Sequence, residues 1–287
     1  MDGEIHIVLA SDANYLPGLE VTRASIARNC SVPERIVWHI FREDDLARLD
    51  VSSFEAWNCG SKMTYLRLFL PELLPEVDRV IYADVDTIWN RDVCKLWDGV
   101  VSAGTERGNA KVSPAIWWVK DFRSIATHEN YGCAGVCVMN LAKLREIRLS
   151  QKAIDYVKRH GTPPFVDQGI LNILLKDDCA ILPSVWNVMG DCSNLPKAGD
   201  PCVYHITGIG RHFHDRTPPT YPPQYLFWWM EKTKVTVNVP LRYKVLAALW
   251  PLHPLANGVS LGLRERLIRQ WFFAKVLVSA VNNIHQE

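Results

Sequence analysis

Two aspartates in this sequence stand two positions apart at the end of an apolar segment. Asp84 and Asp86 follow residues 79–83, whose composition is typical of a buried strand. If the chain stays extended here, both side chains point to the same side and converge beyond the strand. Carboxylates that close repel each other unless a cation or a proton lies between them. Because a hard divalent cation binds through oxygen atoms and can share phosphate ligands, the pair predicts a metal–diphosphate site.

The segments that must position this pair alternate between strand and helix patterns. Apolar runs at residues 5–10 and 35–41 also predict strands, whereas residues 17–29 and 62–74 have helical periodicity. Further short strands or helices are expected near residues 133–141, 152–160, 167–176 and 202–206. This alternation favours an α/β fold with a mostly parallel central sheet flanked by helices.

A second group of polar side chains follows the first expected strand. Asp12, Asn14 and Tyr15 stand in the loop after residues 5–10. Ligands of such sheets bind at the carboxyl ends of the strands, where neighbouring loops meet. We therefore expect these three side chains to share one ligand site with the aspartate pair.

Composition and charge limit the class of protein. The 287 residues suit one large domain, or one domain with an appended subdomain, and the net charge of +1 gives no reason to expect a nucleic-acid partner. The eight cysteines include no CxxC pair, so we expect reduced thiols in a cytoplasmic protein. We expect neither a secretory leader nor a membrane-spanning helix, because the N-terminal residues lead almost directly into a strand pattern and no apolar run reaches the roughly eighteen residues that such a helix needs.

The composition changes in the last quarter of the chain. Residues 216–223 contain four prolines and form an expected connector between a main domain, residues 1–215, and a helical C-terminal region. From residue 240 onward, six Lys or Arg residues stand against two acidic residues, with tryptophan and phenylalanine between them. The segment 263–281 suits a helix that lies on the anionic inner face of a membrane, and it equally suits an aromatic helix packed into a core.

Several separated motifs give the chain a family resemblance over about residues 4–215. These motifs are residues 10–15, 64–68, 80–86, 134–140, 167–172 and 205–208. In this order they resemble the family 8 glycosyltransferases, which include glycogenin-like and bacterial lipooligosaccharide galactosyltransferase-like enzymes. The resemblance implies a GT-A fold for residues 1–215, in which a Rossmann-like nucleotide-binding half and an acceptor half share one central sheet.

The resemblance also implies a reaction and a metal. It implies a retaining hexosyltransferase that takes glucose or galactose from a UDP-sugar and uses Mn²⁺, with Mg²⁺ as the alternative. His205 would join Asp84 and Asp86 as the third metal ligand. The basic, aromatic C-terminal region favours a glycolipid or lipid-linked oligosaccharide as the saccharide acceptor, in the synthesis of a surface polysaccharide.

The resemblance also implies which residues contact the donor. The expected contacts of nucleotide, diphosphate and donor sugar are Ala10, Asp12, Asn14, Tyr15, Arg67, Asp84, Val85, Asp86, Gly208 and Arg211. Tyr15 would stack on the uracil. Arg211 stands where relatives usually have Lys, and its planar guanidinium can still clamp the departing diphosphate. Cys133 stands where many relatives have Asn, which leaves sugar selectivity open.

The implied catalytic residues are Asp167, Gln168 and Arg211. Asp167 and Gln168 would hold the donor sugar on either side of its reactive carbon. A retaining double displacement needs a nucleophile on the far face of that carbon, and Gln168 is a poor one. We therefore expect front-face attack, with the leaving phosphate helping to deprotonate the acceptor.

Other interpretations of these residues remain open from the sequence. Asp84 is also compatible with a haloacid dehalogenase-type phosphatase, in which it would be the nucleophile. The chain is also compatible with a catalytically inactive protein that binds nucleotide sugars. Asp84 and Asp167 are each compatible with a capping role at a turn or helix start, and Arg67 and Arg211 with solvent-exposed positions.

Overall fold

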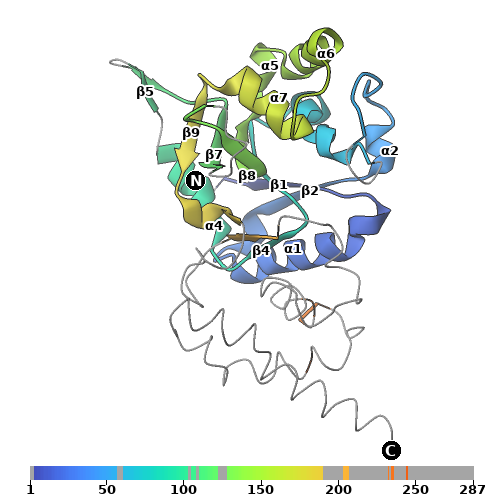
Figure 1. The fold of residues 1–287 in the computed structure, drawn as a ribbon. Helices are drawn as coiled ribbons and strands as arrows, with labels where there is room; N and C mark the ends of the chain where they lie inside the picture. The colour runs from blue at the N-terminus through green and yellow to red at the C-terminus, as the bar shows by residue number, and fades with distance from the viewer. Residues whose placement is uncertain are drawn as a thin grey trace, which may run out of the picture.

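The computed structural model describes residues 3–56, 61–102, 105–107, 110–121, 128–189 and 203–206, together with residues 232, 234, 235 and 244. Through these residues the chain forms three layers, with a six-stranded sheet between two layers of helices (Figure 1). This arrangement confirms the expected α/β class. The expected C-terminal helical region, residues 216–287, lies almost wholly outside the described residues.

The central sheet is mixed and mostly parallel. Its strands are β1 (Ile5–Ala10), β2 (Ile36–Phe41), β3 (Arg79–Ala83), β7 (Ile116–Lys120), β8 (Gly132–Asn140) and β9 (Cys179–Leu182). They lie in the order β2-β1-β3-β8-β7-β9. Only β8 runs antiparallel to both of its neighbours, and Val136 of β8 pairs with Ala83 of β3. The first residues of β8 therefore lie beside the carboxyl end of β3.

Helices cover both faces of this sheet because its strands are apolar on both sides. Along β1, Ile5, Ile7 and Leu9 belong to one hydrophobic cluster, while Val8 and Ala10 belong to the other, as the alternation of side chains along a strand requires. On one face lie η3 (Met63–Phe69), α3 (Leu70–Leu73), α5 (Leu141–Glu146), α6 (Leu149–His160) and α7 (Val166–Leu175), and on the other α1 (Leu16–Asn29) and α4 (Val93–Ser102). Short turns of helix lie at α2 (Glu43–Leu46), η1 (Ala13–Tyr15), η2 (Pro33–Arg35) and η4 (Ser184–Trp186).

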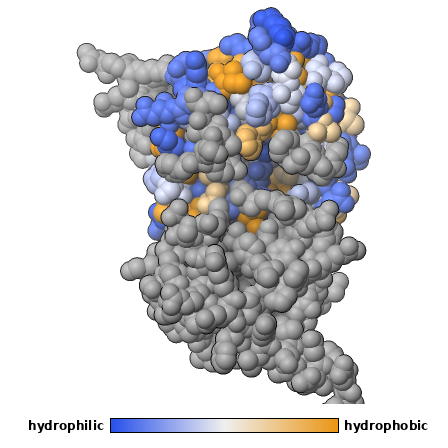
Figure 2. Space-filling view, in the orientation of Figure 1, coloured by the Kyte–Doolittle hydropathy of each residue, from blue (hydrophilic) through white to orange (hydrophobic). Residues whose placement is uncertain are grey.

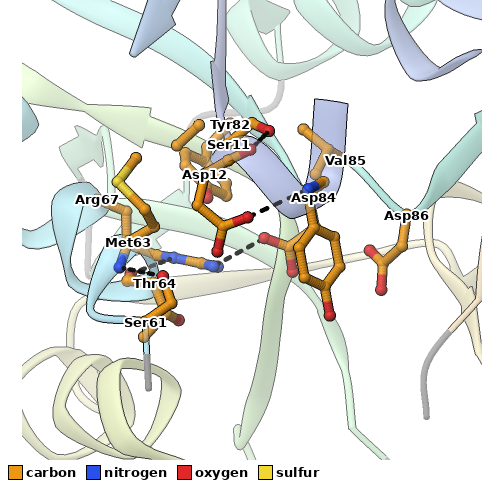
Figure 3. Close-up of a pocket in the computed structure, with 12 residues that line it drawn as sticks. Ser11, Asp12, Ser61, Met63, Thr64, Arg67, Tyr82, Asp84, Val85 and Asp86 are labelled. Atoms are coloured by element: carbon orange, nitrogen blue, oxygen red, sulfur yellow. Dashed lines mark hydrogen bonds and ion pairs between the residues drawn. The ribbon is translucent and has the colours of Figure 1, made fainter. Parts of the chain in front are cut away.

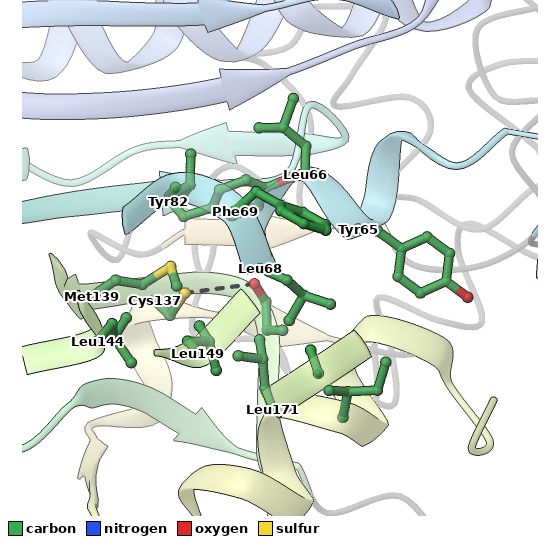
Figure 4. Close-up of a cluster of buried hydrophobic side chains, with 14 of the residues drawn as sticks. Tyr65, Leu66, Leu68, Phe69, Tyr82, Cys137, Met139, Leu144, Leu149 and Leu171 are labelled. Carbon is green, nitrogen blue, oxygen red and sulfur yellow. Dashed lines mark hydrogen bonds between the residues drawn. The ribbon is translucent and has the colours of Figure 1, made fainter. Parts of the chain in front are cut away.

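The cluster on the α5–α7 face joins the η3 segment to the sheet. Figure 4 shows Leu68 of η3 on the side of Leu149 and Leu171 of the covering helices, while Leu66 points to the opposite side of η3; these four side chains and Leu144 are fully buried members of the cluster. Each buried leucine contributes about 1.5–3 kcal/mol relative to its exposed state. The outer side of α6 is hydrophilic (Figure 2), which completes its two-sided pattern.

The expected helix at residues 62–74 forms in two parts. It begins as the 3₁₀ helix η3 and becomes α-helical only at Leu70–Leu73. Pro71 stands in the first turn of that α-helix, where its missing N–H leaves no bond unmade, so it starts an α-helix more readily than it continues one. The other expected strands and helices are found within two or three residues of their predicted ends. Among the described helices, none has the length and apolar character needed to cross a bilayer.

A small three-stranded sheet lies beside the main sheet. Its strands are β10 (Val188–Met189), β11 (Val203–His205) and β4 (Thr87–Trp89), with β11 in the middle. A separate hairpin consists of β5 (Thr105–Arg107) and β6 (Ala110–Val112).

The edge of β4 that faces away from β11 is bound by side chains of α1. Thr22 Oγ1 donates to the carbonyl of Thr87 over 2.7 Å, and the N–H of Trp89 donates to Ser25 Oγ over 3.0 Å. Asn29 Nδ2 donates to the carbonyl of Trp89 over 2.8 Å. Positions 22, 25 and 29 lie on one face of a helix, so α1 satisfies β4 much as a neighbouring strand would.

Replacement of Ser25 tests this support. Ser25→Ala leaves the buried N–H of Trp89 without its acceptor, and we expect the free energy of unfolding to fall by about 1–3 kcal/mol. Urea denaturation followed by circular dichroism measures the loss. Glu20→Ala, at an exposed position of the same helix, is the control and should change the value by less than about 0.5 kcal/mol. Equal effects of the two variants would contradict the role of Ser25.

Candidate active site

Asp84 and Asp86 are brought together by a turn rather than by an extended strand. Val85 and Asp86 form the turn between β3 and β4, so the extended geometry expected from the sequence is wrong, although the carboxylates do converge. Thr87 Oγ1 donates to the carbonyl of Asp84 over 2.8 Å and closes the turn. The N–H of Asp84 donates to the carbonyl of Gly135 over 2.7 Å, which ties the turn to β8.

His205 reaches the same point from a distant part of the chain. It lies on β11 and pairs with Thr87 of β4, and the N–H of Ile206 donates to the carbonyl of Asp86 over 3.0 Å. His205 Nε2 lies 3.2 Å from Asp86 Oδ1 and 3.7 Å from Asp84 Oδ2. One ligand atom of each of the three residues lies within 4.8 Å of the others, so the three expected metal ligands form one cluster.

Gly135 leaves the room that this cluster occupies. A Cβ atom at this position would lie 2.0 Å from His205 Cε1 and 2.9 Å from Asp84 Oδ2. The imidazole ring cannot move away without losing its place beside Asp86. The glycine is therefore required by the close approach of β8 to the cluster.

Asn187 orients the imidazole and was not predicted from the sequence. Its Oδ1 lies 2.9 Å from His205 Nδ1, and both side chains are buried. A histidine that binds a cation through Nε2 must carry its proton on Nδ1, and Asn187 Oδ1 is placed to accept a hydrogen bond from that Nδ1–H. The only sequence signal is a polar residue directly before β10, and the 18 positions between the partners hide the pairing.

The electrostatics of the cluster suit a cation. Burial raises the pKa of Asp84, and the neighbouring Asp86 adds to that rise, while Arg67 opposes it. Burial alone lowers the pKa of His205, yet the Asp86 carboxylate raises it well above the ordinary value overall. Two carboxylates and one imidazole held this close are the donor set of Mn²⁺ or Mg²⁺ sites completed by further oxygen ligands, so the residues fit such a cation.

Arg67 lies buried between two carboxylates. Its Nη2 lies 2.8 Å from Asp84 Oδ1 and its Nε lies 2.8 Å from Asp167 Oδ2. Its Nη1 donates to the carbonyl of Ala134 over 2.6 Å, and the guanidinium lies over the ring of Tyr82. Only 4% of Arg67 is exposed, so the interpretation as a solvent-exposed arginine is wrong.

Asp167 is buried in the first turn of α7 and is not its capping residue. The residue before the helix is Phe165, so the capping interpretation of Asp167 is wrong. Asp167 accepts a hydrogen bond from Thr64 Oγ1 in addition to its ion pair with Arg67. Burial raises the pKa of Asp167 to about 6, against the opposing effect of Arg67.

Gln168 is held at both ends of its side-chain amide. Its Oε1 accepts from the N–H of Ala134 over 3.2 Å, and its Nε2 donates to Asp121 Oδ2 over 3.2 Å. Asp121 is fully buried and was not predicted, because a single aspartate after an apolar segment carries no specific sequence signal. The backbone of Ala134 on β8 thus binds both side chains, Arg67 through its carbonyl and Gln168 through its N–H.

The carboxyl ends of β1 and β3 open into a pocket of about 220 Å³ (Figure 3). It is lined by Ala10, Ser11, Asp12, Tyr15, Ser61, Met63, Thr64, Arg67, Tyr82, Asp84, Val85 and Asp86. In Figure 3 Arg67 reaches across to Asp84, and Asp86 lies on the far side of Asp84. The pocket thus unites predicted residues from both loops. It adds Ser11, Thr64 and Tyr82, which lie in the motifs but were assigned no contact, and Ser61 and Met63, which lie outside them.

Three predicted donor residues are not among the described residues that line the pocket. Asn14 is exposed and does not line the pocket, and Gly208 and Arg211 lie outside the described residues. Asp12 has a structural role as well, because its Oδ1 accepts from the N–H of Asn14 over 2.9 Å and of Tyr15 over 3.1 Å. That contact fixes the start of η1 and thereby places Tyr15 at the pocket.

Comparison with known proteins gives a consistent result. The family described as glycosyl transferase family 8 matches residues 29–207, more than half of the chain. Mouse glucoside xylosyltransferase 2 is 25% identical over 246 residues, which cover 74% of this chain and 54% of the mouse enzyme. Lipopolysaccharide 1,2-glucosyltransferase of Escherichia coli K12 is 24% identical over 213 residues, which cover 64% of this chain and 62% of that enzyme. The chain therefore spans less than two thirds of the length of these two curated relatives.

The solved structures agree with the sequence comparison. The structure of the galactosyltransferase LgtC in complex with donor and acceptor sugar analogues matches with a TM-score of 0.59 and 20% identity. The match covers 84% of this chain and 99% of that chain. At this identity the likeness shows the fold, and it confirms the expected GT-A architecture.

The role of Asn187 can be tested by cation binding. Asn187→Ala removes the acceptor for His205 Nδ1, and we expect the affinity for Mn²⁺ to fall about 10–100-fold. Calorimetric titration with Mn²⁺, with and without UDP, measures the change. Asn187→Asp keeps an acceptor oxygen and should recover most of the affinity. Unchanged affinity in a folded Asn187→Ala protein would show that the contact is not needed.

The buried Asp167 predicts a pH effect on stability. Its raised pKa means that the folded state keeps a proton that the unfolded state has released, so the stabilisation is complete below about pH 4 and is lost as the pH rises through about 6. Relative to Asp167→Asn, the wild type should lose about 2–3 kcal/mol of unfolding free energy between pH 4 and pH 7. Urea denaturation across this range tests it. The exposed Asp177→Asn is the control, and a flat difference for Asp167→Asn would refute the prediction.

Proposed function

The chain belongs to glycosyl transferase family 8, and we propose that it transfers a hexose from a UDP-sugar to a saccharide acceptor with retention at the anomeric carbon. The observation that carries the proposal is the convergence of Asp84, Asp86 and His205 beside the pocket at the carboxyl ends of β1 and β3. The family assignment removes the phosphatase alternative, in which Asp84 is a nucleophile. Both oxygens of Asp84 are also engaged, one with Arg67 and one facing His205.

In this proposal the metal ligands bind the diphosphate of the donor, and the pocket binds its nucleotide. Asp84, Asp86 and His205 would hold Mn²⁺, which neutralises negative charge on the departing diphosphate when bound. Tyr15 and Asp12 line the nucleotide side of the pocket, and Tyr15 is half-buried there, as a ring that stacks on a base would be. Gly208 and Arg211 keep their proposed roles at the diphosphate, with Arg211 as its clamp.

Asp167 and Gln168 orient the donor sugar in this proposal. The amide of Gln168 is fixed by Ala134 and Asp121, which supports a positioning role and not the role of a nucleophile. The carboxylate of Asp167 is neutralised by Arg67 and also bound by Thr64. Neither group is free to attack the anomeric carbon without breaking these contacts. The acceptor hydroxyl then attacks from the side of the leaving phosphate, which takes up its proton.

The sugar and the acceptor are inferred from two sources. The two curated relatives are named for xylose and for glucose, and LgtC for galactose. We propose glucose or galactose as the transferred sugar, with xylose as the next candidate. The relative named for lipopolysaccharide supports a glycolipid or lipid-linked oligosaccharide acceptor. We propose that the enzyme works in the cytoplasm, where its basic, aromatic C-terminal region contacts the inner face of the membrane.

A donor hydrolysis assay tests this function. Purified protein is incubated with Mn²⁺ and UDP-glucose, UDP-galactose or UDP-xylose, and the release of UDP is followed. We expect slow hydrolysis of one donor that EDTA abolishes and that Asp86→Ala lowers at least about 100-fold, because the variant loses a metal ligand.

The same assay separates the remaining alternative. A protein that binds UDP in a Mn²⁺-dependent manner by calorimetry, yet turns over none of the donors with or without saccharide acceptors, would be a nucleotide-sugar binder. Hydrolysis that persists unchanged in Asp86→Ala would contradict the proposed metal site. Asp44→Ala, at an exposed position of α2, is the matched control for loss of one carboxylate.

A further inference from the structure

A second cluster of metal-ligating side chains lies away from the pocket, where α1 ends and α4 begins. It consists of Cys30, Asp92 and Cys94, whose ligand atoms all lie within 4.8 Å of one another. The two sulfur atoms are 3.5 Å apart, and both cysteines are buried. Because 64 positions separate the two cysteines, no spacing motif in the sequence predicts that they form a pair.

The backbone around the cluster holds its three members in place. Cys30 follows the last residue of α1, and Cys94 lies in the first turn of α4. Asp92 Oδ1 accepts from the N–H of Ser31 over 3.2 Å and from the N–H of Cys94 over 3.0 Å. The carboxylate is therefore held by the backbone N–H groups of Ser31, which follows Cys30, and of Cys94 itself. Both of these bonds go to Oδ1 and neither goes to Oδ2.

The surroundings of the cluster lower the pKa of its carboxylate and raise the pKa of the Cys30 thiol. Burial opposes the effect, but hydrogen bonds from Ser31 and Cys94 lower the pKa of Asp92, so its carboxylate is ionised. Burial raises the pKa of Cys30 to about 12. Without a cation the site thus combines one negative carboxylate with a protonated Cys30 thiol. A thiophilic divalent cation would take the place of the two thiol protons and bind the sulfurs as thiolates, which leaves the net charge of the site unchanged.

The two thiols are in contact, and their sulfur–sulfur distance is close to that of two thiolates on one metal. Two thiolates bound to one tetrahedral Zn²⁺ with bonds of about 2.3 Å have sulfurs about 3.8 Å apart. A disulfide requires about 2.05 Å. The observed 3.5 Å needs a small adjustment for the first arrangement and a shift of about 1.5 Å for the second.

We propose that Cys30, Asp92 and Cys94 form a binding site for a thiophilic divalent cation of the Zn²⁺ class, separate from the site of the sugar-transfer reaction. One cation binds two thiolate sulfurs and a carboxylate oxygen, and water completes the tetrahedron beside Asp92, the half-buried member of the cluster. Binding releases the proton of each thiol to solvent and changes no oxidation state. The bound cation links the end of α1 to the start of α4.

Cobalt is the probe that separates this site from the catalytic one. Thiolate-bound Co²⁺ shows a charge-transfer absorption in the near ultraviolet, whereas the Asp84, Asp86 and His205 cluster offers no thiolate of its own. Fully reduced protein is titrated with Co²⁺ and then with Zn²⁺. We expect the absorption to reach the intensity of one thiolate-bound Co²⁺ per chain and to vanish when Zn²⁺ displaces it.

Matched variants assign the absorption to its ligands. It should be lost in Cys30→Ser and in Cys94→Ser, and the affinity should fall about tenfold or more in Asp92→Asn. Asp86→Ala and Cys179→Ser should keep it. Cys133→Ser should keep it as well, and this control is needed because Cys133 Sγ lies 4.0 Å from His205 Nδ1.

A thermal readout covers the case of a variant that does not fold. Zn²⁺ should raise the melting temperature of the wild type and of Asp86→Ala, and the rise should be reduced in Asp92→Asn, in which both thiols remain. Absence of the absorption in the reduced wild type would overturn the proposal. An absorption that survives in both folded cysteine variants would do the same, and so would ready formation of a Cys30–Cys94 disulfide by glutathione disulfide in protein that binds no Co²⁺.

Discussion

The arrangement of the site depends on one buried cation, the guanidinium of Arg67. Asp84 and Asp167 come from segments far apart in the sequence, and each is a carboxylate withdrawn from water. Such groups are unstable in a protein interior unless a positive charge lies close to them. Arg67 contacts both over 2.8 Å and also binds the backbone of β8 through Ala134. It thereby links the metal side of the site to the side proposed for the donor sugar.

Local sequence patterns were sufficient for much of the fold and for part of the site. The strands β1, β2 and β3 follow from runs of apolar residues, and the neighbouring aspartates follow from their position after β3. The geometry that joins those aspartates could not be predicted, because a turn of the same length and an extended strand carry similar residues. The change from 3₁₀ to α-helix at Pro71 was also missed, since the apolar pattern is the same in both.

The residues that sequence reasoning missed are those whose partners are distant. Asn187 and Asp121 act only through side chains that the fold brings to them, and no pattern around either marks it as special. Gly135 lies in the motif at residues 134–140, but its role depends on the approach of His205, which the motif does not reveal. The antiparallel direction of β8 is the reason that several of these contacts exist. Because this strand runs against β3, its first residues, and not its last, meet the turn that carries Asp84 and Asp86.

The contacts between α1 and β4 have a consequence for how this protein behaves among other chains. An outer strand of a small sheet normally presents free N–H and C=O groups, and these can recruit a strand of another molecule. In β4 one edge pairs with β11, while Thr22, Ser25 and Asn29 of α1 occupy the groups on the other. The helix α1 thus satisfies the backbone groups of an edge strand that could otherwise pair with a strand of another molecule. The strand next to the metal ligands is therefore shielded from intermolecular β-pairing, the first step of aggregation.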